Sequence, residues 1–303
     1  MIDNLLVSVV IPHFNSYKSL RNLVESIPDD KRIEIIVVDD NSDFELNACF
    51  FSERTNVRTY LNPGKKGAGS ARNYGMTKCS GEWLLFADAD DYFTAKAFDV
   101  VFRDINTTTS DIVFYKPISW NIDSEISGSR HQRYEKLVLD FIKYKSFDAS
   151  MNLKIKYLVP WSKLIKKDLV YKNNINFDEV MFSNDVMFSV KIGLNANEID
   201  VKEDVIYCVT ENNTSLTKTK NFNSFKTRLD VMFRFNDYLK KHSMNKYCSP
   251  LLSYLIWSKN FGFKVFASTF FSMVYNKQKI IPNLKIDYLK SPQLILQKFR
   301  GYK

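Results

Sequence analysis

The sequence predicts an α/β protein with a mostly parallel sheet flanked by helices, followed by a C-terminal helical appendage. Short runs rich in β-branched residues alternate with segments whose apolar residues have helical spacing, and this order favours parallel strands with helices covering them. Polar clusters stand directly after three of these runs. From Asn221 onward the pattern is helical and rich in Phe, Tyr, Lys and Arg.

The first half of the chain alternates strand and helix. Its predicted strands are apolar enough to be buried, and they are Leu6–Ile11, Ile33–Val38, Trp83–Ala87 and Asp111–Tyr115. We expect Pro12 to end the first strand. The predicted helices are Tyr17–Ile27, Ala71–Cys79 and Thr94–Asp104.

The next hundred residues are less regular. Residues 117–135 have weak periodicity and indicate a surface excursion. Helices are expected at Arg133–Lys145, at Trp161–Tyr171 and from Ser183 onward, and a strand at Val201–Val209. We assign residues 1–219 to one domain and residues 220–303 to a second, helical region.

The polar clusters after the strands point to a ligand site. They are His13–Asn15, Asp39–Ser42 and Asp88–Asp91. Ligands of open α/β sheets bind beyond the carboxyl ends of the strands, so the three clusters are expected to lie together there.

Asp88-Ala-Asp90-Asp91 predicts a divalent cation site. Three carboxylates within four residues repel one another at the end of a buried strand, and Mg²⁺ or Mn²⁺ would compensate that charge. The alternative is a solvated turn that leads into the helix at Thr94. Asp39-Asp40 also has two interpretations. Asp39 could accept hydrogen bonds from a nucleotide, or the pair could be an ordinary acidic turn.

The glycine-rich run Gly64–Gly75 is expected to be a loop that leads into the helix at Ala71. It carries Lys65, Lys66 and Arg72 on backbone that can approach phosphate groups closely. It matches neither a Walker loop nor a dinucleotide fingerprint, and Arg72 by itself would be an ordinary surface residue.

Four ordered motifs resemble those of family 2 glycosyltransferases, which have the GT-A fold. They are Val7-Ser-Val-Val-Ile-Pro-His-Phe-Asn15, Ile36-Val-Val-Asp-Asp-Asn-Ser42, Gly69-Ser-Ala-Arg-Asn-Tyr-Gly75 and Phe86-Ala-Asp-Ala-Asp-Asp91. A fainter resemblance continues through Trp161-Ser-Lys-Leu164 and Phe182-Ser-Asn-Asp-Val-Met-Phe188 to Ser215-Leu-Thr217.

The resemblance implies a role for each matching residue. Pro12, His13 and Asn15 would line the nucleotide pocket, and Asp39 would hold the base, with uridine implied by resemblance alone. Arg72 would lie near the donor diphosphate, with Lys66 close by, and Asp88 near the ribose or metal-bound water. Asp90 would bind the cation, Mn²⁺ or Mg²⁺.

The catalytic base would be Asp185, which stands where the family has the aspartate of a glutamate–aspartate pair. Here the pair reads Asn184-Asp185, so the glutamate's role has no counterpart. The alternative is that Asp185 is only a first-turn acid of a helix capped by Ser183. The family also often has a basic residue after the strand that matches Val205–Val209, whereas this chain has Thr210-Glu211.

One carboxylate base and one metal site suit a single displacement, in which a sugar moves from a nucleotide-diphosphate donor to an acceptor hydroxyl with inversion. The implied acceptor is a glycan on a lipid diphosphate, as in capsule or O-antigen synthesis. The rival classes are a sugar-nucleotide pyrophosphorylase, a dinucleotide oxidoreductase and a catalytically weak scaffold of the same fold. The first two require a glycine-rich loop after the first strand, where this chain has His13-Phe14-Asn15-Ser16.

The net positive charge of the chain is concentrated in the C-terminal region. Residues 220–303 hold 16 Lys and Arg against 3 Asp and Glu, whereas residues 1–219 hold 27 against 31. Basic helices with aromatic faces are typical of anionic membrane surfaces, and no motif indicates nucleic-acid binding. The aromatic residues expected to be exposed are Phe222, Phe225, Phe233, Phe235, Tyr238, Trp257, Phe261, Phe263, Phe266, Phe270 and Phe271. The alternative is that these side chains form the core of a helical subdomain.

The chain is expected in the cytoplasm, peripheral to the inner face of the cell membrane. Its four cysteines form no C-x-x-C pair, which fits reduced thiols better than disulfides or zinc. No signal peptide or membrane-spanning run is recognisable in the sequence.

Overall fold

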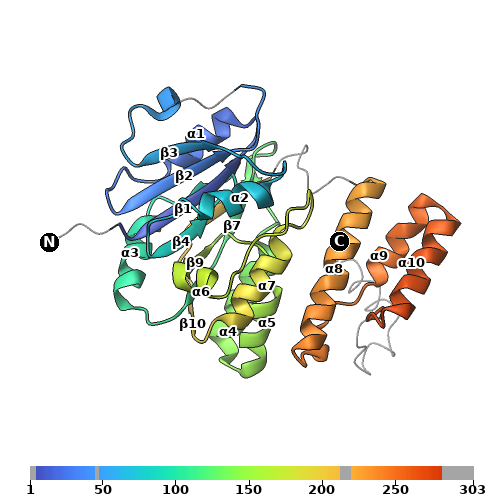
Figure 1. Cartoon of the computed structure of the whole chain (residues 1–303). Coiled ribbons are helices and arrows are strands. Elements are labelled where there is room, and N and C mark those ends of the chain that lie inside the picture. The colour runs from blue at the N-terminus through green and yellow to red at the C-terminus, as the bar shows by residue number, and fades with distance from the viewer. Residues whose placement is uncertain (1–4, 45–47, 212–219, 282–303) are drawn as a thin grey trace. The chain divides into compact units, whose positions relative to one another are not determined.

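The computed structural model describes residues 5–44, 48–211 and 220–281 (Figure 1). The chain divides into two compact units, Met1–Lys218 and Thr219–Lys303. The strands of the first unit are β1 (Val7–His13), β2 (Ile33–Asp39), β3 (Val57–Leu61), β4 (Trp83–Phe86), β5 (Tyr92–Phe93), β6 (Ile112–Tyr115), β7 (Ile118–Asn121), β8 (Ile126–Ser127), β9 (Lys163–Lys166), β10 (Ile199–Lys202) and β11 (Tyr207–Glu211). Its helices are α1 (Tyr17–Glu25), α2 (Ala68–Met76), α3 (Ala97–Thr107), α4 (Gln132–Tyr144), α5 (Phe147–Lys156), α6 (Lys167–Lys172) and α7 (Asp185–Asn195), with a 3-10 turn at Ala48–Phe51.

The main sheet has the strand order β10-β6-β9-β4-β1-β2-β3. All of these strands except β9 run in one direction, which confirms the mostly parallel sheet. Helices cover the sheet, so every side chain of β1 and β2 is buried. That burial is the reason their sequences are mostly apolar rather than alternating; their second residues, Ser8 and Glu34, are buried polar groups that hydrogen-bond to each other.

The expectation that Pro12 ends the first strand is wrong, because β1 continues through His13. Pro12 pairs in register with Val38 of β2, while the ladder with β4 ends at Val10. The missing N–H of Pro12 would point past the end of β4, so proline breaks no sheet hydrogen bond there.

A second sheet with the order β5-β11-β7-β8 is an addition to the predicted architecture. The expected strand Val201–Val209 is in fact two strands, since β10 joins the main sheet and β11 joins the second one. The excursion at residues 117–135 contains β7, β8 and the start of α4. β3 and α5 are further elements that the sequence patterns do not predict.

The predicted helix Trp161–Tyr171 is wrong in its first half. Residues Lys163–Lys166 form β9, which lies antiparallel between β4 and β6. A strand of four residues is too short for periodicity to distinguish it from a helix. Lys163 is buried there, and its Nζ donates a 2.7 Å hydrogen bond to the carbonyl oxygen of Tyr157.

The glycine-rich run is mostly helix rather than loop, because α2 begins at Ala68. Its glycines allow close packing: a Cβ on Gly69 would lie 2.1 Å from the carbonyl oxygen of Asp178. A Cβ on Gly75 would lie 2.7 Å from Val10 in β1. Within this run, Gly67 alone has a backbone conformation that favours glycine, at φ 137°.

The described part of the second unit is helical, with α8 (Phe222–Lys241), α9 (Leu252–Ser258), α10 (Phe263–Tyr275) and 3-10 turns at Asn245–Tyr247 and Lys259–Phe261. The expected exposure of its aromatic residues is wrong for Phe225 and Phe235, which are buried, whereas Phe263 and Phe271 are 81% and 68% exposed. Within the described residues of the chain, no helix combines the length and apolarity needed to cross a membrane.

Candidate active site

His13 and Asp39 lie side by side at the carboxyl ends of β1 and β2. They are register partners, and the N–H of Asp40 donates a 2.7 Å hydrogen bond to the carbonyl oxygen of His13. Both side chains are almost fully buried. Nε2 of His13 and Oδ2 of Asp39 nevertheless have no hydrogen-bond partner in the described part of the chain. Buried polar atoms are rarely left unpaired, so these two atoms indicate a ligand.

The neighbouring polar residues of this edge are already paired. The side-chain amide of Asn15 exchanges hydrogen bonds of 2.8 and 2.9 Å with Asp43, and so ties the ends of β1 and β2 together. Both carboxylate oxygens of Asp40 are occupied, one by Asn62 and one by the N–H of Gly67, each at 2.7 Å. Asp40 therefore supports the start of α2, whereas Asp39 keeps an oxygen available.

Burial lowers the pKa of His13 below its usual value, although the nearby Asp39 carboxylate opposes the shift. The imidazole is consequently neutral near pH 7, with one ring nitrogen directed to Ser16 Oγ at 3.1 Å. A neutral ring beside a carboxyl group suits the donor and acceptor groups of a nucleobase better than those of a phosphate.

The two basic candidates of the glycine-rich run differ in their surroundings. Lys66 is exposed, and its Nζ lies 3.9 Å from the centre of the Phe14 ring, next to the His13 edge. Arg72 is buried in α2 and bridges two distant segments. Its guanidinium donates to Asp88 Oδ1 and, at 2.8 Å, to Asn184 Oδ1. The alternative of an ordinary surface arginine at position 72 is therefore wrong, and the arginine connects two candidate site motifs.

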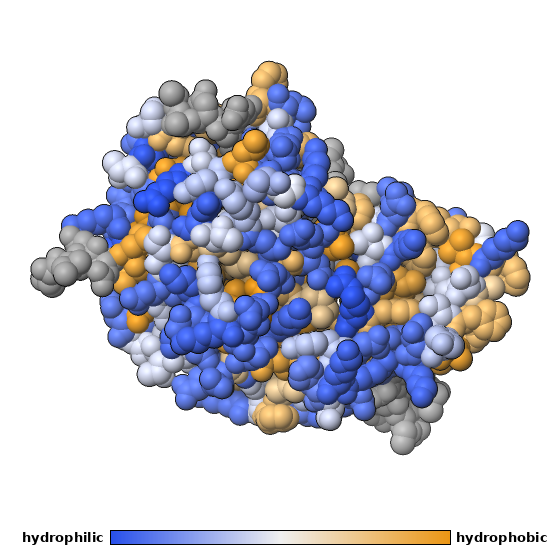
Figure 2. All heavy atoms as spheres, in the orientation of Figure 1, coloured by the Kyte–Doolittle hydropathy of each residue, from blue (hydrophilic) through white to orange (hydrophobic). Residues whose placement is uncertain are grey.

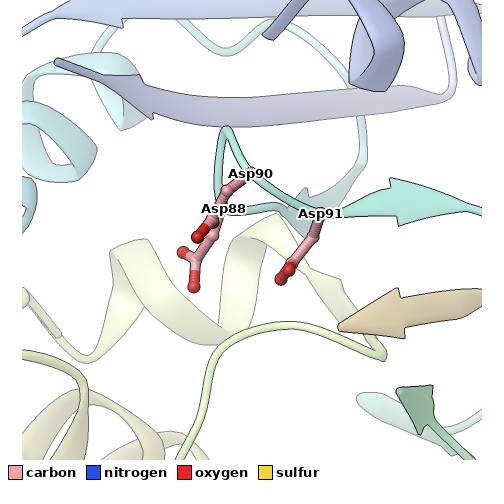
Figure 3. Close-up of side chains that lie close together, drawn as sticks. All are labelled: Asp88, Asp90 and Asp91. Carbon is pink, nitrogen blue, oxygen red and sulfur yellow. The ribbon is translucent and has the colours of Figure 1, made fainter. Parts of the chain in front are cut away.

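The acidic turn after β4 holds three carboxylates with oxygens within 4.8 Å of one another (Figure 3). Asp88 is half-buried, Asp90 is exposed and Asp91 is buried. Both oxygens of Asp91 are taken, one by Tyr207 Oη at 2.8 Å and one by the N–H of Thr210 at 2.7 Å. Asp91 thus anchors the turn to β11, and the carboxylate of Asp90 together with the second oxygen of Asp88, which Arg72 does not bond, remain to bind a cation.

Local electrostatics favour a cation at this turn. Desolvation and the neighbouring Asp88 carboxylate raise the pKa of Asp90, while Arg130 and Arg72 lower it. Oxygen ligands from clustered carboxylates are those that Mg²⁺ and Mn²⁺ prefer, and a bound cation would remove the repulsion that raises this pKa. The residues present therefore fit such an ion.

Asp185 begins α7 and follows Asn184, the acceptor of the Arg72 hydrogen bond. Ser183 does not cap this helix as expected; the cap position is Asn184, without a side-chain hydrogen bond, and Ser183 has φ 58°. Burial raises the pKa of Asp185 to about 6, with Arg72 opposing and Asp88 adding to the shift. A carboxylate with that pKa is ionised at pH 7 yet basic enough to accept a proton.

Sequence reasoning missed two residues beside the acidic turn. Tyr207 Oη accepts from the N–H of Asp88 at 2.9 Å, and the Tyr207 ring stacks on Trp161. Arg130 donates at 3.1 Å to the carbonyl oxygen of Thr210. The only sequence signal is the Trp161-Ser-Lys-Leu164 resemblance, and Arg130 lies in the stretch predicted to be an excursion. Ser215-Leu-Thr217, the last resemblance, lies outside the described residues.

Comparison with known proteins gives consistent matches. The model of glycosyl transferase family 2 matches residues 8–173, which is more than half of the chain. Glycosyltransferase GlyG of Streptococcus pneumoniae is 27% identical over 71% of this chain and 74% of its own length. A GalNAc(5)-diNAcBac-PP-undecaprenol beta-1,3-glucosyltransferase of Campylobacter jejuni is 26% identical over 61% of this chain and 59% of its own length.

Solved structures show the same architecture. The crystal structure of Staphylococcus aureus TarS 1-349 in complex with UDP-GlcNAc matches with a TM-score of 0.61 and 24% identity, over 76% of this chain and 65% of that one. TarS is a poly(ribitol-phosphate) beta-N-acetylglucosaminyltransferase, and the sequence match with this chain spans about a third (34%) of it. The fold of the first unit is the GT-A fold that the sequence motifs predicted.

Proposed function

The chain belongs to glycosyl transferase family 2, and on that premise we propose that it transfers a hexose from a UDP-sugar to an acceptor hydroxyl with inversion at the anomeric carbon. Two of its relatives are named a poly(ribitol-phosphate) beta-N-acetylglucosaminyltransferase and a GalNAc(5)-diNAcBac-PP-undecaprenol beta-1,3-glucosyltransferase, which supports action on nucleotide sugars in bacterial surface-glycan synthesis. The observation that carries the proposal is the Arg72 bridge, which joins the acidic turn at Asp88 to Asn184, the neighbour of Asp185.

The donor nucleotide is proposed to bind at the ends of β1 and β2. The unpaired Asp39 Oδ2 suits an N–H of the base, and the unpaired His13 Nε2 suits a second polar group of the nucleoside. Pro12 and Asn15 would line this pocket, Asn15 through its backbone because its amide is engaged with Asp43. Lys66 and Arg72 would face the diphosphate. TarS, a relative that is 26% identical over 66% of this chain, was solved with UDP-GlcNAc, and this relationship supports uridine as the base.

Asp90 and Asp88 would hold Mn²⁺ or Mg²⁺. When bound, the ion would supply positive charge to the leaving diphosphate. A structural relative, a mannosyltransferase from Pyrobaculum calidifontis, was solved with GDP-Man and Mn2+, at 14% identity and a TM-score of 0.52. That likeness concerns the fold alone, so the proposal for the ion rests on the carboxylates themselves.

Asp185 is proposed to be the general base. It would take the proton of the acceptor hydroxyl while that oxygen forms a bond to the donor's C1. The bond between C1 and the β-phosphate oxygen breaks on the opposite face, and UDP leaves. A single base and a single displacement give inversion.

The proposed acceptor is a glycan linked to a lipid diphosphate, as the name of the Campylobacter relative suggests. The test is a screen of UDP-glucose, UDP-galactose, their N-acetyl analogues and GDP-mannose against an undecaprenyl-diphosphate sugar, with and without Mn²⁺. We expect cation-dependent release of UDP from one donor, and an NMR spectrum showing the inverted anomer in the product. Retention at the anomeric carbon would contradict the mechanism.

The second candidate is a catalytically weak scaffold of a polysaccharide assembly, favoured by Asn184 and Thr210 at positions where the family has other residues. A scaffold would bind UDP without turning over any donor in the screen. Stoichiometric UDP binding without product, on all acceptors tried, would favour this candidate over the enzyme.

The second unit is proposed to dock on an anionic membrane through α10. An exposed stripe runs along one face of this helix at i, i+7, i+8, i+11 and i+12 spacing, formed by Phe263, Phe270, Phe271, Val274 and Tyr275. Figure 2 shows apolar surface gathered over this helix. The helix has no acidic residue; Lys264 lies in its first turn, and Lys277 and Lys279 follow its C-terminal end. An apolar stripe bordered by lysines suits the interface of an anionic bilayer.

In this proposal the enzyme works at the inner face of the cell membrane, next to lipid-linked acceptors. Sedimentation with vesicles containing phosphatidylglycerol tests it. The wild-type chain is expected to pellet at low salt and less so at high salt, and F263E/F271E is expected to remain in the supernatant. The matched control is F147E, which changes an exposed phenylalanine of α5 in the first unit. Equal pelleting of the double variant and the wild type would contradict docking through α10.

A further inference from the structure

Thr210 and Glu211 stand where the family often has a basic residue, and both form hydrogen bonds that hold neighbouring segments in place. The N–H of Thr210 donates to Asp91 Oδ1 at 2.7 Å, and its Oγ1 donates to the carbonyl oxygen of Asp90 at 2.5 Å. The end of β11 is therefore bonded directly to the acidic turn. A basic side chain at position 210 could not make the Oγ1 contact.

Glu211 holds a second segment against the same place. Its Oε1 accepts from the N–H groups of Ser129 and Arg130 at 2.6 and 2.7 Å. Burial opposes ionisation, but the hydrogen bonds from Arg130 and Ser129 prevail and lower the pKa of Glu211. A Cβ on Gly128 would lie 2.3 Å from the same oxygen, so a glycine is needed for this close approach. The carboxylate thus fixes the backbone just before α4.

The fixed backbone aims Arg130 at the acidic turn. Its guanidinium donates to the carbonyl oxygen of Thr210 at 3.1 Å, and Thr210 is the residue whose N–H and Oγ1 bond Asp91 and Asp90. No carboxylate of the described residues lies within ion-pair distance of the Arg130 guanidinium, although its positive charge contributes to the lowered pKa of Glu211. Arg130 is therefore half-buried positive charge beside the acidic turn, and its side chain is bonded to one neutral acceptor there.

We propose that Arg130 binds the diphosphate of the donor and stabilises it as the leaving group, in place of the basic residue absent after β11. The inference rests on the proposed function. Negative charge grows on the β-phosphate oxygen as its bond to C1 breaks, and a guanidinium can donate two N–H bonds to phosphate oxygens. Glu211 acts as a positioning residue, because it holds the backbone from which Arg130 extends.

The competing explanation is that Arg130 only ties β11 to α4. Affinities for UDP and for uridine separate the two, because uridine lacks the diphosphate. Calorimetry at fixed Mn²⁺ is expected to show R130A with about 10- to 100-fold weaker UDP binding, the range for a hydrogen bond to a charged group, and unchanged uridine binding. Its kcat is expected to fall by about 10²- to 10³-fold, as when one preorganised donor is removed from a developing anion.

R133A is the matched control, because Arg133 is an exposed arginine of α4 and its substitution removes the same charge. This variant is expected to bind UDP as the wild type does. E211A should weaken UDP binding without changing uridine binding, and R130K should retain part of the UDP affinity because it keeps the charge.

Two results would overturn the inference. One is an R130A chain with wild-type affinity for UDP. The other is a parallel loss of UDP and uridine affinity together with a lowered Tm, which would mean a structural tie. A wild-type chain that binds no UDP at all would overturn the proposed function as well, whereas normal wild-type turnover with an unaffected R130A would overturn this inference alone.

Discussion

Replacing Asp185 by Asn separates a catalytic base from a helix-terminal acid. As a base, Asp185 must be ionised to accept the acceptor's proton, and an amide cannot accept it. We expect D185N to lower kcat by at least about 10²-fold, the usual minimum for such a group. The affinity of D185N for UDP should change little, because in this proposal Asp185 acts on the acceptor hydroxyl and does not bind the nucleotide.

The pH dependence gives an independent measure. Because burial raises the pKa of Asp185 to about 6, the ionised, active form is lost as the pH falls through that value. kcat/KM should therefore drop about tenfold per pH unit below an apparent pKa of about 6, or somewhat lower when a cation is bound nearby. The D185N profile should be flat in this range. A wild-type inflection that persists in D185N would assign the titration to another group.

The change in stability that D185N causes is expected to have opposite signs under the two explanations. A folded pKa of about 6 against the ordinary aspartate value of 3.8 means that ionised Asp185 destabilises the fold above pH 6, and not below about pH 4. This difference in pKa sets an upper limit of about 3 kcal/mol for the destabilisation, and partial exposure of the side chain reduces it to about 1 kcal/mol. D185N should thus raise Tm at pH 7 by about 2–4 °C.

A helix-terminal acid would behave differently. Its removal would lower Tm, because a carboxylate in the first turn is stabilised by the helix dipole. D99N provides the matched control, since Asp99 is an exposed acid in the first turn of α3. It should lose a little stability and keep normal activity. A D185N chain with lowered Tm and normal kcat would refute the assignment of Asp185 as the base.

Three further substitutions test the remainder of the site and the fold. D90N should lower kcat severely and raise the Mn²⁺ concentration needed for half-maximal activity, because an amide is a poorer ligand for a hard cation; full activity in excess EDTA would contradict this. R72K should lower kcat, because an ammonium cannot reproduce the planar guanidinium bridge to Asp88 and Asn184. Its circular dichroism spectrum should show little change in secondary structure, and unchanged kinetics would show the bridge to be dispensable. G69A should lower the free energy of unfolding by about 1–3 kcal/mol in urea titration, because its Cβ would overlap the carbonyl oxygen of Asp178; an unchanged midpoint would show that α2 can shift.

The strands at the heart of the GT-A unit were determined by the sequence alone. β1, β2, β4 and β6 are predominantly apolar runs, and such runs indicate burial on both faces of a strand without any knowledge of its partners. The polar residues after them are equally local signals. Because parallel strands end at one edge, the positions of His13 and Asp39 directly after two such runs are enough to predict that they meet.

Short elements could not be assigned in this way. β9 has four residues, and the same apolar pair, Leu164 and Ile165, is compatible with helix or strand until β4 and β6 are in place on either side. The glycine-rich run resembles a loop because glycine disfavours helix. Its glycines are in fact required by the close packing of α2 on its neighbours. Those neighbours are distant in the sequence, so the requirement is visible only in the tertiary structure.

The network around the acidic turn was decided by the tertiary structure. Arg72 reaches Asn184 across 112 positions of the chain, and Arg130 reaches Thr210 across 80. Propensity and periodicity report the surroundings of a residue a few positions away, so they leave such pairs undetermined. The sequence therefore determined which residues carry charge at the ends of strands, and the folded topology determined which of those charges meet, because contacts between distant segments exist only when the sheets are assembled.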